Sequence, residues 1–343
     1  MPTVELAPAP PSGSAIARAP RERTASWPLV DRIGYWLCWA VGIGLCLLAL
    51  AIVLYMFVKG ISYLRPSLFV ESPASSVKQS QSGGFLDPIV GTLIVATIGI
   101  AIAMPAGVAI ATWLSEYRRP SWLARAVESA IEMIAGVPSV VLAIFGLIIF
   151  AQPFLGFLSE TAASGTVSGK SFFTAGAVMA VLALPLIVAS TREGLTQLSD
   201  RLREASFALG RTPATTIRRV LLPAIRPDIA SGTVLGLGRI IGDTAIINIV
   251  LGLTVTNEGV GHAPLISTLR GTGSTLTSYI YTNSPAGEGS APQKAYAAAF
   301  VLLMVVLGLN GIVTLLTRSS GERDRGLLSR AFRLIPYMPD LSR

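Results

Sequence analysis

Long apolar runs recur along this chain and are separated by shorter polar stretches. Each run is close to the roughly 20 residues that a helix needs to cross a bilayer, and its apolar residues are continuous rather than alternating as in a barrel strand. Because only helices and closed barrels satisfy the backbone in lipid, the pattern predicts an all-α, polytopic membrane protein. We place six transmembrane spans at residues 33–58, 86–113, 130–151, 171–191, 228–253 and 295–317.

Composition excludes an ordinary soluble domain. Of the 343 residues, 52% are hydrophobic and 13% are charged, whereas a globular domain carries roughly a quarter charged residues. The net charge of +8 raises the alternative of nucleic-acid binding. The positions of the charges argue against it: with a cytoplasmic N-terminus, 20 basic residues fall in inside segments, 6 in outside segments and one within a span. We therefore expect both termini in the cytoplasm and no nucleic-acid partner.

The remaining segments define the domain organisation. Residues 1–30 are rich in Pro, Ala, Ser and Arg and are expected to form a disordered cytoplasmic tail. A transmembrane domain follows over 31–320, with its core at 86–317, and residues 321–343 form a cytoplasmic C-terminal tail. Within the domain, 152–170 and 253–291 are expected to be long loops.

The loop at 196–226 has the pattern of a helix, a turn and a second helix. Gly210 suits a helix end, Thr212 can cap the next helix, and Pro213 fits its first position. Pro223 is expected to end that second helix. An exposed helical hairpin is suited to docking into a groove on a cytoplasmic partner.

An alternative interpretation of this loop is an amphipathic helix that rests on the inner leaflet. In that case Arg218 and Arg219 would hold it there.

The hairpin resembles the EAA signature of permease subunits from bacterial ABC importers. The matching residues, at the family's spacings, are Glu204, Ala205, Gly210, Leu222 and Pro223. Ser206 replaces the second Ala of the signature, and Val220 replaces Ile. The resemblance implies a type I ABC importer permease fold, with this loop forming the coupling helices that seat in separate ATPase subunits.

Further stretches narrow the resemblance to the phosphate importer permeases PstA and PstC over roughly residues 60–317. They are Gly83–Thr92, Met104–Ile110, Leu114–Tyr117, Gly136–Val141 and Gly238–Ala245. The opening of the second span and the lack of a large insertion after the first favour PstA. Where the family usually has Glu, this chain has Asp243, which keeps the charge and shortens its reach.

The resemblance also implies the partners and the location. They are inorganic phosphate, a PstC-like sister permease, a PstB-like ATPase dimer that carries ATP and Mg, and a PstS-like external binding protein, at the bacterial cell membrane. This chain itself would hold no cofactor.

Charges inside the fifth span mark a candidate substrate path. Arg239 and Asp243 are four residues apart, which would place them on one face of a helix, and Thr244 follows. Intramembrane charges are costly and usually mark a pathway, and an Arg can contact two phosphate oxygens at once. The alternative is a structural ion pair that fixes helix packing. Gly232, Gly236, Gly238 and Gly242 on the same span predict close helix approach at an interface between two permeases.

Two further groups of residues leave alternatives open. Pro105, Pro138 and Pro185 interrupt spans and are either hinges or static kinks. Glu128 and Glu132 are either a solvated start of the third span or ion ligands.

No catalytic activity is expected. The chain has no phosphate loop ending in Gly-Lys-Ser or Gly-Lys-Thr, and a lone histidine, His262, gives neither a Ser-His-Asp set nor a metal site. The rival functions are a PstC-like sister subunit, a permease for molybdate or sulfate, a secondary transporter that uses Arg239 and Asp243, and a sensor or scaffold that does not transport.

Overall fold

The computed structural model describes residues 29–61, 63–73, 84–117, 120–159, 167–252, 268–285, 287 and 291–333, with side chains beyond 315 described only at 317. Every regular element in these ranges is a helix. The chain divides into two compact units, residues 1–54 and 55–343. The predicted N-terminal tail at 1–28 and His262 lie outside the described residues.

Helix α1 (Leu29–Ile61) supplies all of the first unit that the structure describes. Its 33 residues span roughly 50 Å at the helical rise, and its apolar stretch is 0% buried. Its last turns belong to the second unit and pack on α13 (Pro292–Arg333), where the ring centroids of Tyr55 and Tyr296 are 5.6 Å apart. An apolar helix of this length requires lipid or protein around it.

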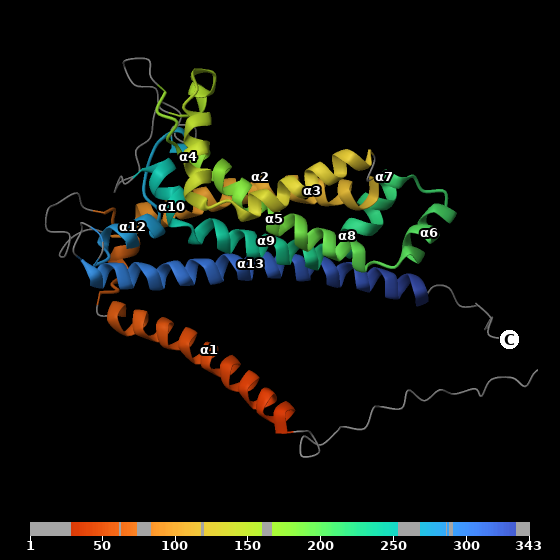
Figure 1. Ribbon diagram of the computed structural model, residues 1–343, viewed down its shortest axis with the longest axis horizontal. Helices are drawn as coiled ribbons and strands as arrows, with labels where there is room; N and C mark the ends of the chain where they lie inside the picture. The colour runs from red at the N-terminus through yellow and green to blue at the C-terminus, as the bar shows by residue number, and fades with distance from the viewer. Residues whose placement is uncertain are drawn as a thin grey trace, which may run out of the picture. The chain divides into compact units, whose positions relative to one another are not determined.

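The second unit is organised around α5 (Phe172–Gln197), which packs against α2 (Leu86–Thr112) and α9 (Arg226–Gly242) (Figure 1). The apolar stretch of α5 is 67% buried, against 28% for the span that contains α2 and 17% for α13. Close approach depends on glycine: a Cβ at Gly176 would lie 2.5 Å from Cγ2 of Ile98 on α2. Helix α5 is therefore the core of the unit.

The structure confirms an all-α membrane architecture. Among the residues that the structure describes, four helices are long and apolar enough to span a bilayer, and two bent pairs bring the number to as many as six. The third expected span, 130–151, is not one helix, because α3 (Ser121–Gly136) and α4 (Ser139–Phe150) meet at 111°. Pro138 sits at the break and precedes the first residue of α4, whereas Pro105 and Pro185 lie inside continuous helices.

The expected loop 253–291 is wrong in part, because it contains a buried helix, α12 (Leu276–Asn283). A capping box between Thr275 and Ser278 starts this helix. The backbone N–H of Leu276 donates to Oγ1 of Thr92 on α2 at 2.9 Å. Helix α13 also passes the expected end of its span at 317 and continues to Arg333.

The contact of α2 with the segment before α12 gives a stability prediction. A Cβ at Gly91 would lie 2.1 Å from the backbone oxygen of Ser274, which cannot move aside as a flexible side chain can. We expect Gly91→Ala to lower stability by about 1–3 kcal/mol through overpacking. Thermal unfolding of the purified protein in detergent measures the loss.

Gly308→Ala is the matched control, because a Cβ on Gly308 meets nothing within 4 Å. It should leave the melting temperature unchanged or raise it slightly, since Ala is the better helix former. Equal melting temperatures for both variants would contradict the close contact at Gly91.

Candidate functional site

The segment that carries the EAA-like residues folds as a short helical hairpin. We call residues 200–224 the hairpin: α6 (Asp200–Ala208), α7 (Pro213–Thr216), the π-helical turn η5 (Ile217–Leu221) and α8 (Leu222–Ala224). As expected, Gly210 has a positive φ of 73°, and the Thr212 side chain caps α7, which begins at Pro213. The helix–turn–helix prediction is confirmed.

One detail of that prediction is wrong. Pro223 does not end the second helix; it lies inside α8, and the break comes at Ile225. The proline lacks an N–H to donate, and the π-helical turn η5 lies directly before α8. Helix α9 then leaves at 68° to the hairpin's second arm.

The two arms of the hairpin are joined by a buried hydrogen bond. Oγ of Ser206 and Oγ1 of Thr216 are 2.8 Å apart. Ser206 is the residue that departs from the second Ala of the signature, so the departure supplies a polar cross-link between the arms. At the base, Ile217, Leu221 and Ile225 pack against Leu195 of α5.

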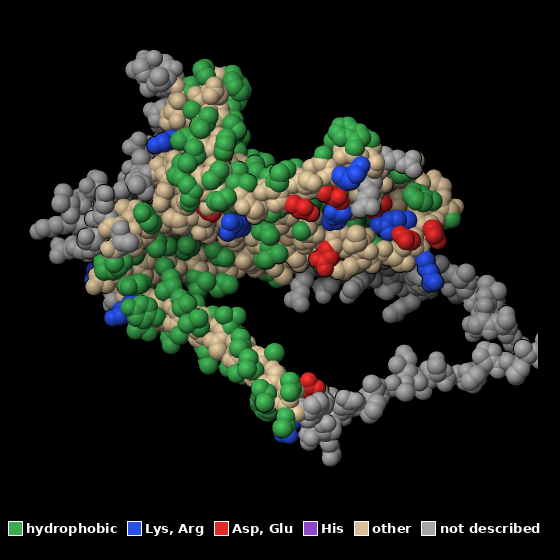
Figure 2. All heavy atoms as spheres, in the orientation of Figure 1, with side chains coloured by type: hydrophobic (Ala, Val, Ile, Leu, Met, Phe, Trp, Pro, Cys, Tyr) green, Lys and Arg blue, Asp and Glu red, His purple; other side chains and the backbone are tan. Residues whose placement is uncertain are grey.

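The outer side of the hairpin is exposed. Glu204, Ala205 and Gly210 are exposed there, whereas Leu222 and Pro223 are half-buried. At the turn, Phe207 is 49% and Leu209 is 77% exposed. Figure 1 shows the hairpin at one end of the second unit, with α4, α10 and α12 at the other end, and Figure 2 shows charged side chains gathered towards the hairpin end. An apolar tip in polar surroundings is a surface suited to a protein partner.

Arg203 anchors the hairpin to the membrane helices. Its guanidinium donates to Oε1 of Glu116 at 2.8 Å, and Glu116 lies in the π-helical turn η3 (Trp113–Tyr117) that continues α2. It also donates to the carbonyl oxygens of Leu195 at 3.0 Å and Leu198 at 3.3 Å, at the end of α5. The hydrogen bond to Glu116 is the largest effect on the pKa of Arg203; together with the charges of Glu116 and Asp200 it raises this pKa above its ordinary value, against the opposing effect of burial. One side chain thus ties α6 to both α2 and α5.

A second ion pair lies nearby. Nη2 of Arg192 on α5 is 2.5 Å from Oε1 of Glu128 on α3. Neither alternative stated for Glu128 describes this position, because its carboxylate joins two helices. Sequence patterns miss both pairs, since the partners are 64 and 87 residues apart.

The fifth expected span breaks in the middle. Helix α9 ends at Gly242, and Asp243 is extended (φ −83°, ψ 112°). Oδ1 of Asp243 accepts from the backbone N–H of Ile246 at 3.0 Å and so caps α10 (Thr244–Ile246), which leads into the π-helical turn η6 (Ile247–Leu251). The expectation that Arg239 and Asp243 share one helical face is therefore wrong, and among the described residues they form no ion pair. A carboxylate that accepts from a backbone N–H at the start of a new helix favours the break.

Each charge instead suits the helix end where it lies. Arg239 is in the last turn of α9 and Asp243 at the start of α10, as the helix dipoles favour. Oγ1 of Thr277 on α12 donates to the carbonyl oxygen of Ile241 at 2.8 Å, which fixes the end of α9. The break is thus supported from three helices.

The glycines of α9 divide between two faces. A Cβ at Gly232 would lie 2.9 Å from Cβ of Ser190, and one at Gly236 would be 3.4 Å from Cβ of Ala183, both on α5. At these two glycines the close approach is to a helix of the same chain, and the expected interface with a second permease stays a prediction. A Cβ at Gly238 or Gly242 would meet nothing within 4 Å. The exposed stripe of α9 is formed by Ser231, Leu235, Gly238, Arg239 and Gly242.

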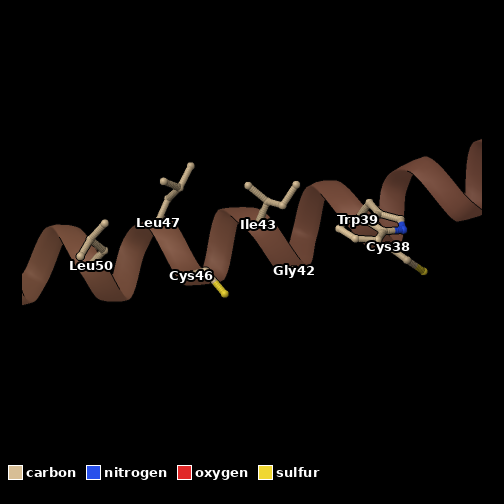
Figure 3. A pocket seen from close by; sticks show the side chains of 7 residues that line it. All are labelled: Cys38, Trp39, Gly42, Ile43, Cys46, Leu47 and Leu50. Carbon is tan, nitrogen blue, oxygen red and sulfur yellow. The ribbon is translucent and has the colours of Figure 1, made fainter.

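Two other features are not candidate sites. A hollow of about 530 Å³ on α1 is lined by seven residues of that helix alone and has no second wall (Figure 3). It includes Cys38 and Cys46, both free thiols. Across the part of the chain that the structure describes, no three His, Cys, Asp or Glu side chains gather as a metal site would require.

The anchor at Arg203 gives a prediction about the hairpin. Replacing Glu116 by Gln removes the charge from a pair whose side chains are only 14% and 20% exposed. We expect a loss of about 1–3 kcal/mol, together with faster proteolysis between α6 and α7. Asp200→Asn is the control, because Asp200 also contacts Arg203 but is 88% exposed; it should change neither measurement. Equal effects of the two variants would contradict the anchoring role.

Comparison with known proteins identifies the family. The model described as "Binding-protein-dependent transport system inner membrane component" matches residues 99–320, more than half of the chain. The phosphate transport system permease protein PstC of Pasteurella multocida is 35% identical over 185 residues, which cover 50% of this chain and 58% of that protein. The match thus spans little more than half the length of that relative. PstA 1 of Mycobacterium tuberculosis is 30% identical over 246 residues, which cover 72% of this chain and 74% of that protein.

Solved structures agree on the fold. A bacterial alginate ABC transporter, in complex with an alginate pentasaccharide-bound periplasmic protein, has a chain that is 18% identical with a TM-score of 0.57. The alignment covers 85% of this chain and 97% of that one. The protein therefore has the type I ABC importer permease fold and belongs to the family of inner-membrane components of binding-protein-dependent transport systems.

Proposed function

We propose that this chain is the permease subunit of an ATP-driven importer of inorganic phosphate. It forms the translocation path with a sister permease and is driven by ATPases that dock on the hairpin. The observation that carries the proposal is the hairpin itself, an exposed EAA-like element fixed directly to the helix that bears Arg239. The phosphate permeases among the relatives support the choice of substrate.

The hairpin tip supplies the docking surface for the ATPase. Leu209 and Phe207 are exposed apolar side chains on a short helical element, and such a knob fits a groove on a partner. The excess of basic residues in the segments on the same side of the membrane supports a cytoplasmic location for this end, and for both termini. ATP and Mg would bind the partner ATPases and not this chain.

The hairpin is connected directly to the membrane helices, so its movement would be transmitted to them. Leu221 and Ile225 pack at the hairpin base directly before α9 begins at Arg226. Arg203 joins the same element to α2 and α5. When ATP binding draws two ATPases together, the paired hairpins would follow, and α9 would tilt about the bend at Ile225. The path would then open alternately to the two sides.

Arg239 supplies the transient site for phosphate. It lies 13 residues after Arg226, or roughly 20 Å along α9 from the hairpin end. Its guanidinium fork can bind two phosphate oxygens. Asp243 and Thr244 lie at the adjoining break, and the negative charge of Asp243 would keep phosphate binding weak enough for release. Gly238 and Gly242, on the exposed stripe beside Arg239, leave room for a substrate or for the sister permease.

The sister permease would be PstC-like if this chain is PstA-like. The relative named PstA 1 matches over more of this chain, while relatives named PstC match at higher identity over about half to two thirds of it, so a PstC-like role is the second candidate. Copurification with each type of sister distinguishes the two assignments. The periplasmic protein in the alginate transporter complex supports a PstS-like binding protein as the external partner here.

Three rival functions have separate tests. In proteoliposomes that hold the complex, uptake of labelled phosphate that sulfate or molybdate suppresses equally well would favour another oxyanion. Uptake without a stoichiometric ATPase, or uptake insensitive to vanadate, would favour a secondary transporter. Failure of phosphate and its binding protein to stimulate ATP hydrolysis, together with no uptake, would favour a sensor or scaffold.

Substitution of Leu209 tests whether the hairpin tip is the docking surface for the ATPase. We expect Leu209→Asp to weaken copurification of the ATPase by about tenfold or more, because a charge replaces an apolar contact at the centre of the interface. Val70→Asp is the control, since Val70 is 74% exposed and follows Leu68, which packs against Leu276 of α12 at the end of the unit away from the hairpin. Copurification is measured as the ratio of ATPase to permease on a gel. An unchanged ratio for Leu209→Asp would reject the hairpin tip as the docking surface.

Substitution of Arg239 tests whether this residue contributes to the substrate path. Loss of a charge-assisted contact of about 1.5–3 kcal/mol predicts that Arg239→Ala reduces phosphate uptake by roughly 10- to 100-fold at equal expression. Arg125→Ala is the control, because Arg125 is exposed on α3 and, within the described part of the chain, its side chain hydrogen-bonds to the carbonyl oxygen of Ser121 on its own helix. Normal uptake by the Arg239 variant would reject the role of Arg239.

A further inference from the structure

We propose that the second unit bends at a hinge marked by Pro105, Pro138 and Pro185. On one side lies the hairpin-end half, which holds the hairpin, α3 and the parts of α2 and α5 that follow their prolines. On the other side lies the far half, which holds α4 and the parts of α2 and α5 that precede their prolines. The proposal rests on the proposed function only for the force that moves the hinge.

Apolar packing divides α2 at its proline. Val95 and Ala103, before Pro105, belong to one cluster of buried residues, which we call the far cluster. Ala111, after Pro105, belongs with Leu114 of η3 to a second cluster, the hairpin-end cluster. Side chains within a cluster are close-packed and transmit displacement to one another. Relative movement therefore disrupts least packing at the boundary between the two clusters.

The other helices divide at the same boundary. On α5 the two clusters meet beside Pro185, where they overlap by Leu184 and Ile187. Helix α3 contributes to the hairpin-end cluster and α4 to the far cluster. The 111° break between α3 and α4 at Pro138 thus falls on this boundary as well.

The prolines of α2 and α5 lie at the same level. Gly99 approaches Gly176, and Gly107 approaches Ile187, so residue numbers rise together along the two helices. A Cβ at Gly107 would lie 2.7 Å from Cγ2 of Ile187. Each proline comes two residues before this contact, which is roughly 3 Å along its helix. The two helices are therefore interrupted side by side.

Each proline weakens its helix, because it has no N–H for the carbonyl oxygen four residues earlier, at Ala101 in α2 and at Val181 in α5. Sharp kinks, of more than about 20°, form at such positions. With both donors absent at one level, α2 and α5 can bend together and stay packed. On α9, Gly236 contacts Ala183 and Ile187 of α5 at this level and has no side chain to obstruct the bend.

The hairpin-end half is held together by ion pairs. Arg203 joins the hairpin to Glu116 and to the end of α5. Arg192 of α5 pairs with Glu128 of α3. All four residues lie on the hairpin side of the prolines, so a force on the hairpin would turn this half as one piece.

The far half has contacts of its own. The backbone N–H of Phe172, at the start of α5, donates to the carbonyl oxygen of Gly271 at 3.1 Å. A Cβ at Gly146 of α4 would lie 2.3 Å from Cγ2 of Val178 on α5. Both contacts lie before Pro185 on α5, so this half would stay fixed while the hairpin-end half turns.

The test is double electron–electron resonance between spin labels on the two halves, in the whole complex in nanodiscs with an unlabelled sister. Cys38 and Cys46 are replaced by Ser. Labels are attached at two exposed positions, through Arg125→Cys on α3 and Phe154→Cys in η4 (Pro153–Leu158), which follows α4. Arg125 lies 13 residues before Pro138. At roughly 20 Å from the hinge, a turn of about 20° would move this label by roughly 7 Å.

The variants restore the missing donors. We expect Pro105→Ala/Pro185→Ala to make the distance distribution about twofold narrower in the absence of nucleotide, since both helices regain their hydrogen bonds. ATP with vanadate should shift the parent distance by roughly 7 Å and that of the double variant by less than about 2 Å. Pro105→Ala alone should give a smaller effect of the same sign, and it spares the core because Pro105 is exposed. Pro66→Ala is the control, because Pro66 is an exposed proline at the start of η2 (Pro66–Phe69), outside both clusters; it should match the parent.

Two outcomes would overturn the hinge. A parent distribution as narrow as that of the double variant would mean that the prolines are static kinks, and so would a broad distribution that neither proline variant narrows. If the double variant does not fold, which its melting temperature shows, Pro105→Ala decides alone. A distribution that responds to the prolines but not to ATP would support the hinge and count against ATPase docking on the hairpin, and so against the proposed function.

Discussion

The close packing of α5 against α2 and α9 is the constraint on which the rest of the structure depends. In lipid there is no hydrophobic force between helices, and association relies on small residues that let backbones approach. Gly176 faces Ile98, Gly107 faces Ile187, and Gly232 faces Ser190, each at a distance that leaves no space for a Cβ. These contacts hold three helices as one block. The block carries the hairpin at one end and the break at Asp243 further along α9.

The hairpin is attached to this block by polar contacts as well as by packing. Arg203 satisfies two carbonyl groups at the end of α5 and the carboxylate of Glu116 after α2. Ser206 and Thr216 close the hairpin on itself. An element joined in this way transmits displacement to several helices at once, because it cannot tilt without moving the ends of both α2 and α5. A force applied at the tip would therefore reach the block as a whole.

Local chemistry made much of this structure predictable from sequence. The length of the apolar runs predicts the membrane helices. Gly210, Thr212 and Pro213 predict the hairpin, because capping and turn preferences act over a few residues. The sequence does not predict the break at Asp243. A capping Asp inside an apolar run cannot be told from a buried charge until the backbone N–H that it accepts from is known. The sequence does not predict helix α12, because its Thr- and Ser-containing sequence is typical of a loop and is stabilised by burial against α13 and α2. The partners Glu116 and Arg203 are 87 residues apart, and only the fold brings them together.

The interruption of α9 constrains what can surround it. A helix that stops at Gly242 leaves its final carbonyl groups without intrahelical partners. The hydroxyl group of Thr277 donates a hydrogen bond to one of them, the carbonyl oxygen of Ile241. Lipid hydrocarbon cannot form hydrogen bonds with the remaining carbonyl groups, and irregular backbone at membrane depth is tolerated only beside protein or water. The end of α9 at Gly242 must therefore lie beside protein or water in the assembled transporter.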